Sequence, residues 1–231
     1  AILIETTTGE ILYEKDIHKQ LRPASVTKIM SLLLFMEALE RNEISYDTPI
    51  PCSENASSMG GSQIWLNTTE TLSVNEMLKA ICVVSANDCC VAMSEYIAGS
   101  EELFVEQMNR RAKELGMNDT FFKNCHGIDE DGHVTSAYDI SVMSRELITK
   151  HPKITEYTTI WMDSLRNGQS ELVNTNKLIN FYEGTDGLKT GHTDNAGYCL
   201  AKTAKRGDLR LIGVILGEEN SKVRNNEMID L

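Results

Sequence analysis

Ser25 and Lys28 are the first candidate pair for chemistry, because they lie three residues apart in Ser25-Val26-Thr27-Lys28. On a helix, positions i and i+3 are neighbours on one face, so the hydroxyl and the amine would meet. A serine hydroxyl is a poor nucleophile until a base removes its proton. Lys28 can be that base only when it is neutral, which burial and a second nearby cation would favour. The same spacing also fits a helix-capping serine followed by an ordinary lysine.

A second candidate group is Ser85-Ala86-Asn87, which lies between two apolar helical segments. A hydroxyl beside a carboxamide can relay a proton and hold a substrate amide. Because Ser and Asn are also favoured in turns, this group alone is equally typical of a connection between helices.

The third group, Lys189-Thr190-Gly191, lies in a predicted strand within an unusually specific string over residues 186–194. Lys189 offers a positive charge, Thr190 a hydroxyl, and Gly191 space for a substrate to approach the backbone. The alternative is an edge-strand lysine next to a glycine bulge.

The elements that position these groups begin with a long helix predicted over about residues 25–41. Its apolar residues occur on nearly every side, so we expect the helix to be buried at the centre of the protein. Pro23 keeps Arg22 out of the helical region. Ser25 would then stand at the helix start, where unpaired N–H groups and the helix dipole favour an oxyanion.

The rest of the chain divides into strands at both ends and helices between them. Apolar periodicity predicts helices over residues 74–84, 88–98, 101–115, 137–150 and 221–231. Alternation and turn residues predict strands over residues 2–4, 11–13, 187–193, 198–204 and 209–216. Residues 53–62 and 124–132 are expected to be loops. This order predicts an α/β chain of the α+β type, with one antiparallel sheet built by both chain ends and an all-helical insertion.

Charge and hydropathy narrow the possible functions. The chain has 34 acidic and 22 basic residues and a net charge of −12, which argues against nucleic acid as a partner. No apolar run approaches the roughly 20 residues of a membrane span. Ala1 begins directly in a strand-like segment, so we expect a mature or trimmed chain in which targeting signals are not visible.

The cysteines and histidines predict neither disulfides nor a metal site. Four of the six cysteines lie in apolar helical or strand-like segments, so all are expected to be buried free thiols. Cys125, His126 and His133 fit no standard zinc spacing, and no further ligand is evident. We expect a loop histidine that orients the rim of the site, and no metal or organic cofactor.

Together and in this order, the three groups resemble the trio found in penicillin-binding proteins and class A β-lactamases. The chain is most similar to the low-molecular-mass D-Ala-D-Ala carboxypeptidases of peptidase family S11, and the resemblance covers essentially its whole length. It rests on residues 22–30, Met59-Gly60-Gly61-Ser62, residues 85–88, His126-Gly127 and residues 187–197.

The resemblance implies a β-lactamase/transpeptidase-like fold in a single catalytic domain over residues 1–231. A sheet subdomain would comprise about residues 1–24 and 170–231, and a helical subdomain about residues 42–169. The C-terminal β domain of the family and its amphipathic membrane anchor are expected to be absent from this chain. Contact with a membrane would depend on that missing anchor alone.

The resemblance also assigns roles. Ser25 would be the nucleophile, and Lys28 the acylation base, although which lysine is the base stays open. Ser85 would pass protons beside Asn87. The substrate would be bound by Lys189 and Thr190 at its terminal carboxylate, next to Gly191, and by the backbone N–H groups of Ser25 and His192 as the oxyanion hole.

Arg224 is a further candidate for the substrate carboxylate, since the family carries an arginine on the last helix. The alternative is a solvated helix arginine beside Lys222. The position that often carries another arginine is Thr175 here, which leaves a second carboxylate contact unassigned.

The implied activity is removal of the terminal D-Ala from peptidoglycan stem pentapeptides, outside the cytoplasmic membrane, with β-lactams as covalent inhibitors. A serine β-lactamase is one rival, but the Glu-x-x-Leu-Asn element of class A enzymes is missing, and residues 70–75 have the wrong spacing. A non-hydrolytic penicillin-binding module is another rival, against which the three intact groups argue. Transpeptidation stays open as a variant of the same chemistry.

Overall fold

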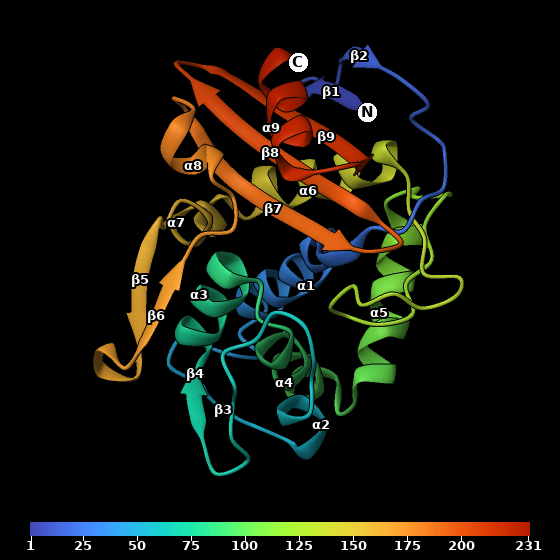
Figure 1. The fold of residues 1–231 in the computed structure, drawn as a ribbon. Helices are drawn as coiled ribbons and strands as arrows, with labels where there is room; N and C mark the ends of the chain where they lie inside the picture. The colour runs from blue at the N-terminus through green and yellow to red at the C-terminus, as the bar shows by residue number, and fades with distance from the viewer.

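One antiparallel sheet joins the two ends of the chain, in the computed structural model that describes residues 1–231. Its strand order is β2-β1-β9-β8-β7, so the N-terminal hairpin extends the C-terminal meander (Figure 1). Ile2 lies opposite Val214, which fixes the register between the two ends. The strands are β1 (Ile2–Glu5), β2 (Ile11–Glu14), β7 (Thr185–Thr193), β8 (Gly197–Arg206) and β9 (Leu209–Glu218). The predicted sheet shared by both chain ends is confirmed.

Helices fill the middle of the chain, largely where periodicity predicts them. They are α1 (Lys28–Glu40), α2 (Glu54–Ser57), α3 (Val74–Val84), α4 (Asn87–Ala98), α5 (Glu101–Glu114), α6 (Ala137–Lys150), α7 (Thr155–Thr158), α8 (Leu178–Phe181) and α9 (Ser221–Asp230). The short helix α2 lies inside the predicted loop 53–62, where the Ser53 side chain accepts a hydrogen bond from the Ala56 N–H at 2.9 Å.

Two small antiparallel strand pairs were not predicted. They pair β3 (Pro49–Pro51) with β4 (Thr71–Ser73), and β5 (Met162–Leu165) with β6 (Ser170–Val173). Strands of three or four residues are too short to show a clear alternation in sequence.

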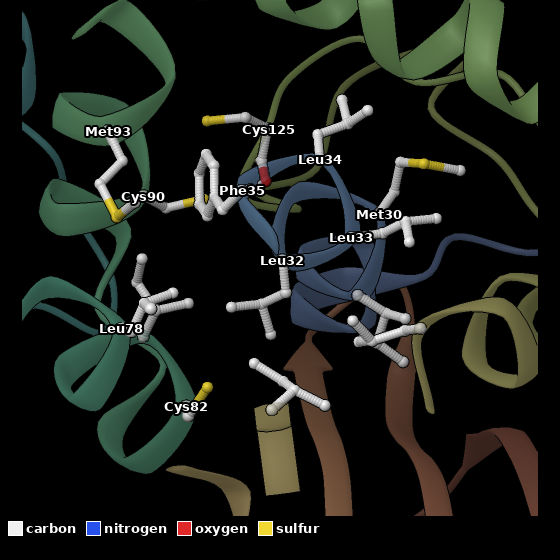
Figure 2. Packing of buried hydrophobic residues seen from close by; sticks show 14 of the residues in the cluster. Met30, Leu32, Leu33, Leu34, Phe35, Leu78, Cys82, Cys90, Met93 and Cys125 are labelled. Atoms are coloured by element: carbon white, nitrogen blue, oxygen red, sulfur yellow. Dashed lines mark hydrogen bonds between the residues drawn. The ribbon is translucent and has the colours of Figure 1, made fainter. Parts of the chain in front are cut away.

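Helix α1 is the centre of the fold, as its apolar composition predicts. It lies between the sheet with α6 and the helices α3, α4 and α5 (Figure 1). Figure 2 shows Leu32, Leu33 and Phe35 pointing in different directions from α1 into the core, and all three are buried. A fully buried leucine contributes about 1.5–3 kcal/mol, so this helix is a large part of the stability. Neither α1 nor any other helix has the length and apolarity to cross a membrane.

The beginning of α1 differs from the prediction. Residues Ala24–Thr27 form a 3-10 turn, and the α-helix starts only at Lys28. Ser25 therefore does not stand at the end of the α-helix. In a 3-10 turn the side chains at i and i+3 eclipse each other, so this geometry brings Ser25 and Lys28 together directly.

Helix α6 crosses the expected division into subdomains. Its residues fall inside the predicted helical part, 42–169, yet it packs against β1 and β9 of the sheet as well as against α1. The predicted boundary at 170 also falls within the hairpin that pairs β5 with β6. The sheet side of the fold therefore includes a helix that chain order alone assigns to the insertion.

The six cysteines are free and buried, as predicted. They act as small apolar side chains in the core, and Figure 2 shows Cys82, Cys90 and Cys125 among the aliphatic residues.

Gly127 packs directly against the backbone of the 3-10 turn, and its replacement tests this contact. Gly127 has φ +96°, and an added Cβ would lie 1.9 Å from the Ala24 carbonyl oxygen. Gly127→Ala should lower the free energy of unfolding by at least about 3 kcal/mol, measured by denaturant titration. Gly116→Ala is the matched control, because Gly116 has φ +75° with no atom within 4 Å, and should cost only about 1–2 kcal/mol. Equal losses for the two variants would contradict the packing argument.

Candidate active site

The Lys28 amine lies within hydrogen-bond distance of the Ser25 hydroxyl. Lys28 Nζ is 3.0 Å from Ser25 Oγ, 2.6 Å from Asn87 Oδ1 and 2.7 Å from the His126 carbonyl oxygen. A neutral amine has two N–H bonds and one lone pair. If the two N–H bonds go to the two carbonyl oxygens, the lone pair points at Ser25 Oγ. The sequence pair is thus arranged as a hydroxyl facing an amine that can accept its proton.

Burial favours the neutral form of this amine. Lys28 is fully buried, and burial lowers its pKa to about 8, partly offset by the more distant Asp88. Its three hydrogen-bond partners are all uncharged oxygens, which solvate the amine without fixing its charge. Close to neutral pH, a substantial fraction of Lys28 is therefore neutral.

Lys189 is the second buried amine of the site. It comes from β7 and is only 1% exposed, and its Nζ donates to the Thr190 carbonyl oxygen at 3.0 Å. Burial and, next, the charge of Lys28 lower the pKa of Lys189 to about 7. The charge of Lys28 therefore disfavours protonation of Lys189.

Ser85 carries a strained backbone and an unpaired hydroxyl. It ends α3 in the left-handed conformation at φ +65°, and its Oγ is buried without a hydrogen-bond partner. Both features are costly, and such costs concentrate at functional sites. Ser85 lines the same cavity as Ser25, so its unpaired hydroxyl lies beside the space that a bound molecule would occupy.

Asn87 connects the lysine to a neighbouring loop. Its side chain accepts from Lys28 and donates to the Gly60 carbonyl oxygen at 2.7 Å, while its N–H donates to the Ser62 carbonyl oxygen at 2.7 Å. Asn87 also begins α4. The segment after α2 is therefore held at the site by the same residue that orients Lys28.

Gly191 lines the cavity that a substrate is expected to enter, and it also makes room for the Ser25 turn. An added Cβ would lie 3.0 Å from Pro23 O and from Ser25 N, and 3.1 Å from Ala24 Cβ. The close approach of β7 to this turn explains the glycine.

A cavity of about 300 Å³ contains most of the predicted residues. It is lined by Ser25, Ser62, Ser85, Thr175, Lys177, Thr190, Gly191, His192, Tyr198, Ser221, Arg224 and Asn225. No carboxylate is among them, whereas Lys177 and Arg224 are cationic. Lys28, Asn87 and Lys189 lie behind this lining. The electrostatics suit an anionic ligand, although the whole chain is acidic.

Arg224 lies in the cavity wall and is not a solvated arginine. It is 5% exposed, and its guanidinium bonds Asn225 Oδ1 at 2.9 Å and faces the Cys199 carbonyl oxygen at 3.4 Å. Burial lowers its pKa below the usual value, but an arginine stays charged at neutral pH.

His192, by contrast, is exposed, with its ring against Tyr198 at a centroid distance of 4.0 Å.

Several cavity residues were not predicted from sequence. Thr175 Oγ1 lies 2.7 Å from Thr190 Oγ1, so the position without an arginine carries a hydroxyl paired to the site. Ser221 and Tyr198 also line the cavity. The sequence gives no specific signal for these residues, because isolated threonines, serines and tyrosines occur throughout the chain.

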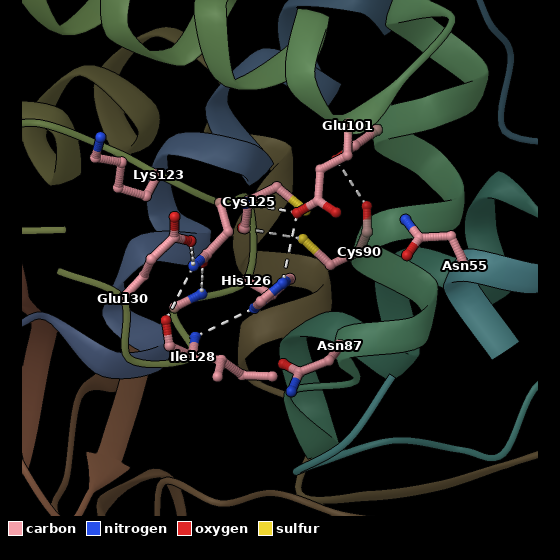
Figure 3. Close-up of polar contacts among 12 residues, drawn as sticks. Asn55, Asn87, Cys90, Glu101, Lys123, Cys125, His126, Ile128 and Glu130 are labelled. Carbon is pink, nitrogen blue, oxygen red and sulfur yellow. Dashed lines mark hydrogen bonds and ion pairs between the residues drawn. The ribbon is translucent and has the colours of Figure 1, made fainter. Parts of the chain in front are cut away.

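His126 holds Lys28 through its backbone carbonyl oxygen, whereas the sequence predicted only a loop histidine that orients the rim of the site. Figure 3 shows its ring between Glu101 and the Ile128 N–H, which donates to Nδ1 at 3.1 Å. Nε2 is 3.4 Å from Glu101 Oε1. Burial and the charge of Lys28 lower the pKa of His126 to about 3, so the ring is neutral. The contacts of the ring fix the residue whose backbone carbonyl oxygen accepts from Lys28.

His133 has a structural setting and no metal-binding neighbours. It lies 2.8 Å from Thr27 Oγ1 and accepts from the Lys123 N–H at 3.0 Å. No group of three or more His, Cys, Asp or Glu side chains in the chain is arranged to hold a metal ion.

Solved structures that match this fold are penicillin-binding proteins. Penicillin-binding protein 6B from Escherichia coli has a TM-score of 0.92 and 35% identity, over 98% of this chain and 73% of that chain. Penicillin-binding protein D2 from Listeria monocytogenes, in its ampicillin-bound form, has a TM-score of 0.89 and 33% identity, over 98% of this chain and 92% of that chain. The class is therefore the transpeptidase-like fold of penicillin-binding proteins, as predicted.

Sequence comparison defines the family within that class. Residues 1–220 match the peptidase S11 family model, described as D-alanyl-D-alanine carboxypeptidase. The chain is 50% identical over 231 residues to D-alanyl-D-alanine carboxypeptidase DacF of Bacillus subtilis (strain 168), covering 99% of this chain and 59% of that protein. It thus spans about three fifths of the length of this relative. The chain belongs to the peptidase S11 family, which confirms the predicted resemblance.

The buried amine of Lys28 predicts a pH-dependent stability. Its folded pKa of about 8 lies below the ordinary lysine value of 10.5, so between these values the unfolded chain binds more protons and stability rises with pH. From pH 7 to pH 9 the free energy of unfolding of the natural chain should rise by about 1 kcal/mol relative to Lys28→Met. Denaturant titrations of both proteins across this range give the difference.

Lys79→Met is the matched control, because Lys79 is a partly exposed lysine paired with Asp163 at 2.7 Å. The difference between Lys79→Met and the natural chain should not change between pH 7 and pH 9. A constant difference between Lys28→Met and the natural chain would show that Lys28 stays charged in the fold.

Proposed function

We propose that this chain is a serine D-Ala-D-Ala carboxypeptidase, which removes the terminal D-Ala from peptidoglycan stem pentapeptides through an acyl-enzyme on Ser25. The observation that carries the proposal is the contact of 3.0 Å between Ser25 Oγ and a fully buried Lys28 amine, at the wall of a cationic cavity. The family and its named carboxypeptidase relatives support the same activity.

Acylation begins when Ser25 Oγ attacks the carbonyl carbon of the bond between the two D-Ala residues. The hydroxyl proton moves to Lys28 Nζ, and the negative charge develops on the former carbonyl oxygen. Backbone N–H groups of Ser25 and His192 are proposed to stabilise that oxyanion. Lys28 is the proposed base because it touches Ser25, whereas the only hydrogen bond of the Lys189 amine is to the Thr190 carbonyl oxygen.

Collapse of this intermediate expels D-Ala, whose nitrogen needs a proton. The unpaired hydroxyl of Ser85 is proposed to deliver it and to regain one from Lys28 or Lys189, which completes the transfer. Water then attacks the ester carbonyl, the Ser25 hydroxyl is restored, and the shortened peptide leaves with a new carboxylate.

The terminal carboxylate of the substrate is proposed to bind between Thr190 and Arg224, with Lys189 behind them. A bound carboxylate would favour the charged form of the Lys189 amine, whose pKa is about 7 in the free site. Both Thr190 and Arg224 line the cavity, and Thr175 offers a further hydroxyl next to Thr190. Asn87 is proposed to hold a substrate amide at the opposite wall. No metal or organic cofactor enters this scheme.

β-Lactams are proposed as covalent inhibitors, since their ring carbonyl is an activated mimic of the same bond. Penicillin-binding protein D2 from Listeria monocytogenes has been solved in ampicillin-bound and cefotaxime-bound forms. Because peptidoglycan lies outside the cytoplasmic membrane, the protein is proposed to act in the cell envelope.

A serine β-lactamase is less well supported because the cavity lining contains no carboxylate to activate a deacylating water. Glu70 begins the segment 70–75 that was compared with the Glu-x-x-Leu-Asn element. It is bound by Arg166 at 2.8 Å and does not line the cavity. Fast, sustained turnover of nitrocefin would favour this rival. Adduct formation without release of D-Ala would favour a non-hydrolytic binding module.

Replacement of the nucleophile is the direct test. Ser25→Ala should lower release of D-Ala from a stem pentapeptide by at least about 10³-fold, because no other hydroxyl of the cavity is hydrogen-bonded to a basic side chain. Intact-mass spectrometry should find one penicillin on the natural chain, mapped to the peptide that contains Ser25, and none on the variant. Ser62→Ala removes another hydroxyl of the cavity and should still be acylated. An adduct on Ser25→Ala would overturn the proposal.

A further inference from the structure

Trp65 is an aromatic side chain that points into solvent from a strained backbone conformation. It is 77% exposed, although both of its neighbours, Ile64 and Leu66, are buried. Its backbone has φ +55°, the left-handed region that is unfavourable for a bulky residue. Single exposed apolar residues are common on protein surfaces, but they rarely require a strained backbone. The exposure and the strained backbone of Trp65 together require an interaction that holds the residue in this conformation.

The cause is a buried carboxylate that fixes the backbone on both sides of Trp65. Asp88 is fully buried, and it accepts from the Ile64 N–H at 3.1 Å and from the Leu66 N–H at 3.0 Å. Arg166 donates to the Ile64 carbonyl oxygen at 2.9 Å. Charge-assisted hydrogen bonds of this kind are strong, so the strained conformation is held rigidly and the indole cannot fold back into the core.

This segment lies next to the proposed active site. Asp88 directly follows Asn87, which binds Lys28, and Ser62 lines the cavity three residues before Trp65. Three residues span at most about 11 Å of extended chain. A stem pentapeptide has four residues before its scissile bond, which reach about 14 Å when extended. The sugar that carries the peptide can therefore reach Trp65 while the peptide end occupies the cavity.

The chemistry around Trp65 suits a neutral carbohydrate. Residues 55–69 contain no charged side chain and are rich in hydroxyl and amide groups, including Ser62, Gln63, Asn67 and Thr68. The C–H face of a pyranose ring carries slight positive charge and stacks on the negative face of an indole. Hydroxyls and amides around the ring can bond its polar groups. An anionic membrane surface would instead need a cluster of free lysines and arginines, whereas Arg166, the cation beside Ile64, is paired with Glu70 at 2.8 Å.

We propose that Trp65 is a stacking platform for a pyranose ring of the glycan strand to which the stem peptide is attached. The proposal rests on the proposed carboxypeptidase function and adds a preference for glycan-linked over free peptide substrates. Asp88 and Arg166 are positioning residues for this platform. Binding of the sugar at Trp65 raises the effective concentration of the stem peptide at Ser25.

The kinetic test compares two substrates. Trp65→Ala should lower kcat/KM about 3- to 10-fold for uncross-linked glycan strands bearing pentapeptides, as expected for loss of one aromatic contact. The free pentapeptide should be cleaved, and Ser25 acylated by penicillin, at unchanged rates. Phe181→Ala is the matched control, because Phe181 is 71% exposed on α8, and it should change neither substrate. Trp65→Tyr should retain most of the preference.

An equal loss for both substrates, or none for either, would overturn the proposal. If the natural chain releases no D-Ala from the free pentapeptide, the proposed function fails, and binding alone then tests Trp65. Trp161→Phe leaves Trp65 as the only tryptophan, and an N-acetylglucosamine tetramer should change its fluorescence. A change with phospholipid vesicles and none with the sugar would also overturn the platform.

Discussion

The burial of the Lys28 amine against the Ser25 hydroxyl, with the buried Lys189 amine near enough to feel its charge, is the constraint on which the rest of the structure depends. An unpaired ammonium buried in a protein costs several kcal/mol, yet Lys28 is fully buried and has only neutral oxygen partners. Those partners come from the 3-10 turn, from the start of α4 and from the loop before α6. The fold must therefore bring three distant segments to one amine, and the apolar helix α1 supplies the scaffold that allows it.

Support for this arrangement comes from outside the cavity. The neutral ring of His126 and the close contact of Gly127 with Ala24 hold the carbonyl that accepts from Lys28. Asp88 holds the segment after α2 in the same way that Asn87 does, by binding its backbone. Asn87, which orients Lys28, and Asp88, which fixes the backbone around Trp65, are adjacent residues. The site and the surface next to it are therefore held by one connected set of hydrogen bonds.

Sequence patterns predicted most of the fold because its main helices and strands are long and strongly periodic. The predicted start of α1 was wrong because a single 3-10 turn is too short to be told from the first turn of an α-helix by its apolar pattern. The short strand pairs β3–β4 and β5–β6 give too little alternation to be seen. The position of α6 on the sheet was missed because chain order does not show which face of a helix finds a partner.

The site was predictable where a motif carries several residues together, as in Ser25 with Lys28 and in Lys189 with Thr190. Arg224 could be named but not placed, because only the path of α9 brings it to the cavity. Thr175 was visible only as a missing arginine, and its hydroxyl contact with Thr190 depends on side-chain geometry. The role of His126 was misjudged since the relevant atom is its backbone carbonyl, which no residue type reveals.

The pH dependence of Ser25 acylation by a penicillin tests the central claim most directly. With folded pKa values of about 8 for Lys28 and about 7 for Lys189, the rate constant should rise with pH and level off above an apparent pKa between them. Lys28→Arg, which stays charged, should lose at least about 100-fold of the rate at pH 8. A rate that is constant from pH 6 to pH 9, or one that Lys28→Arg leaves intact, would contradict a neutral Lys28 acting on Ser25.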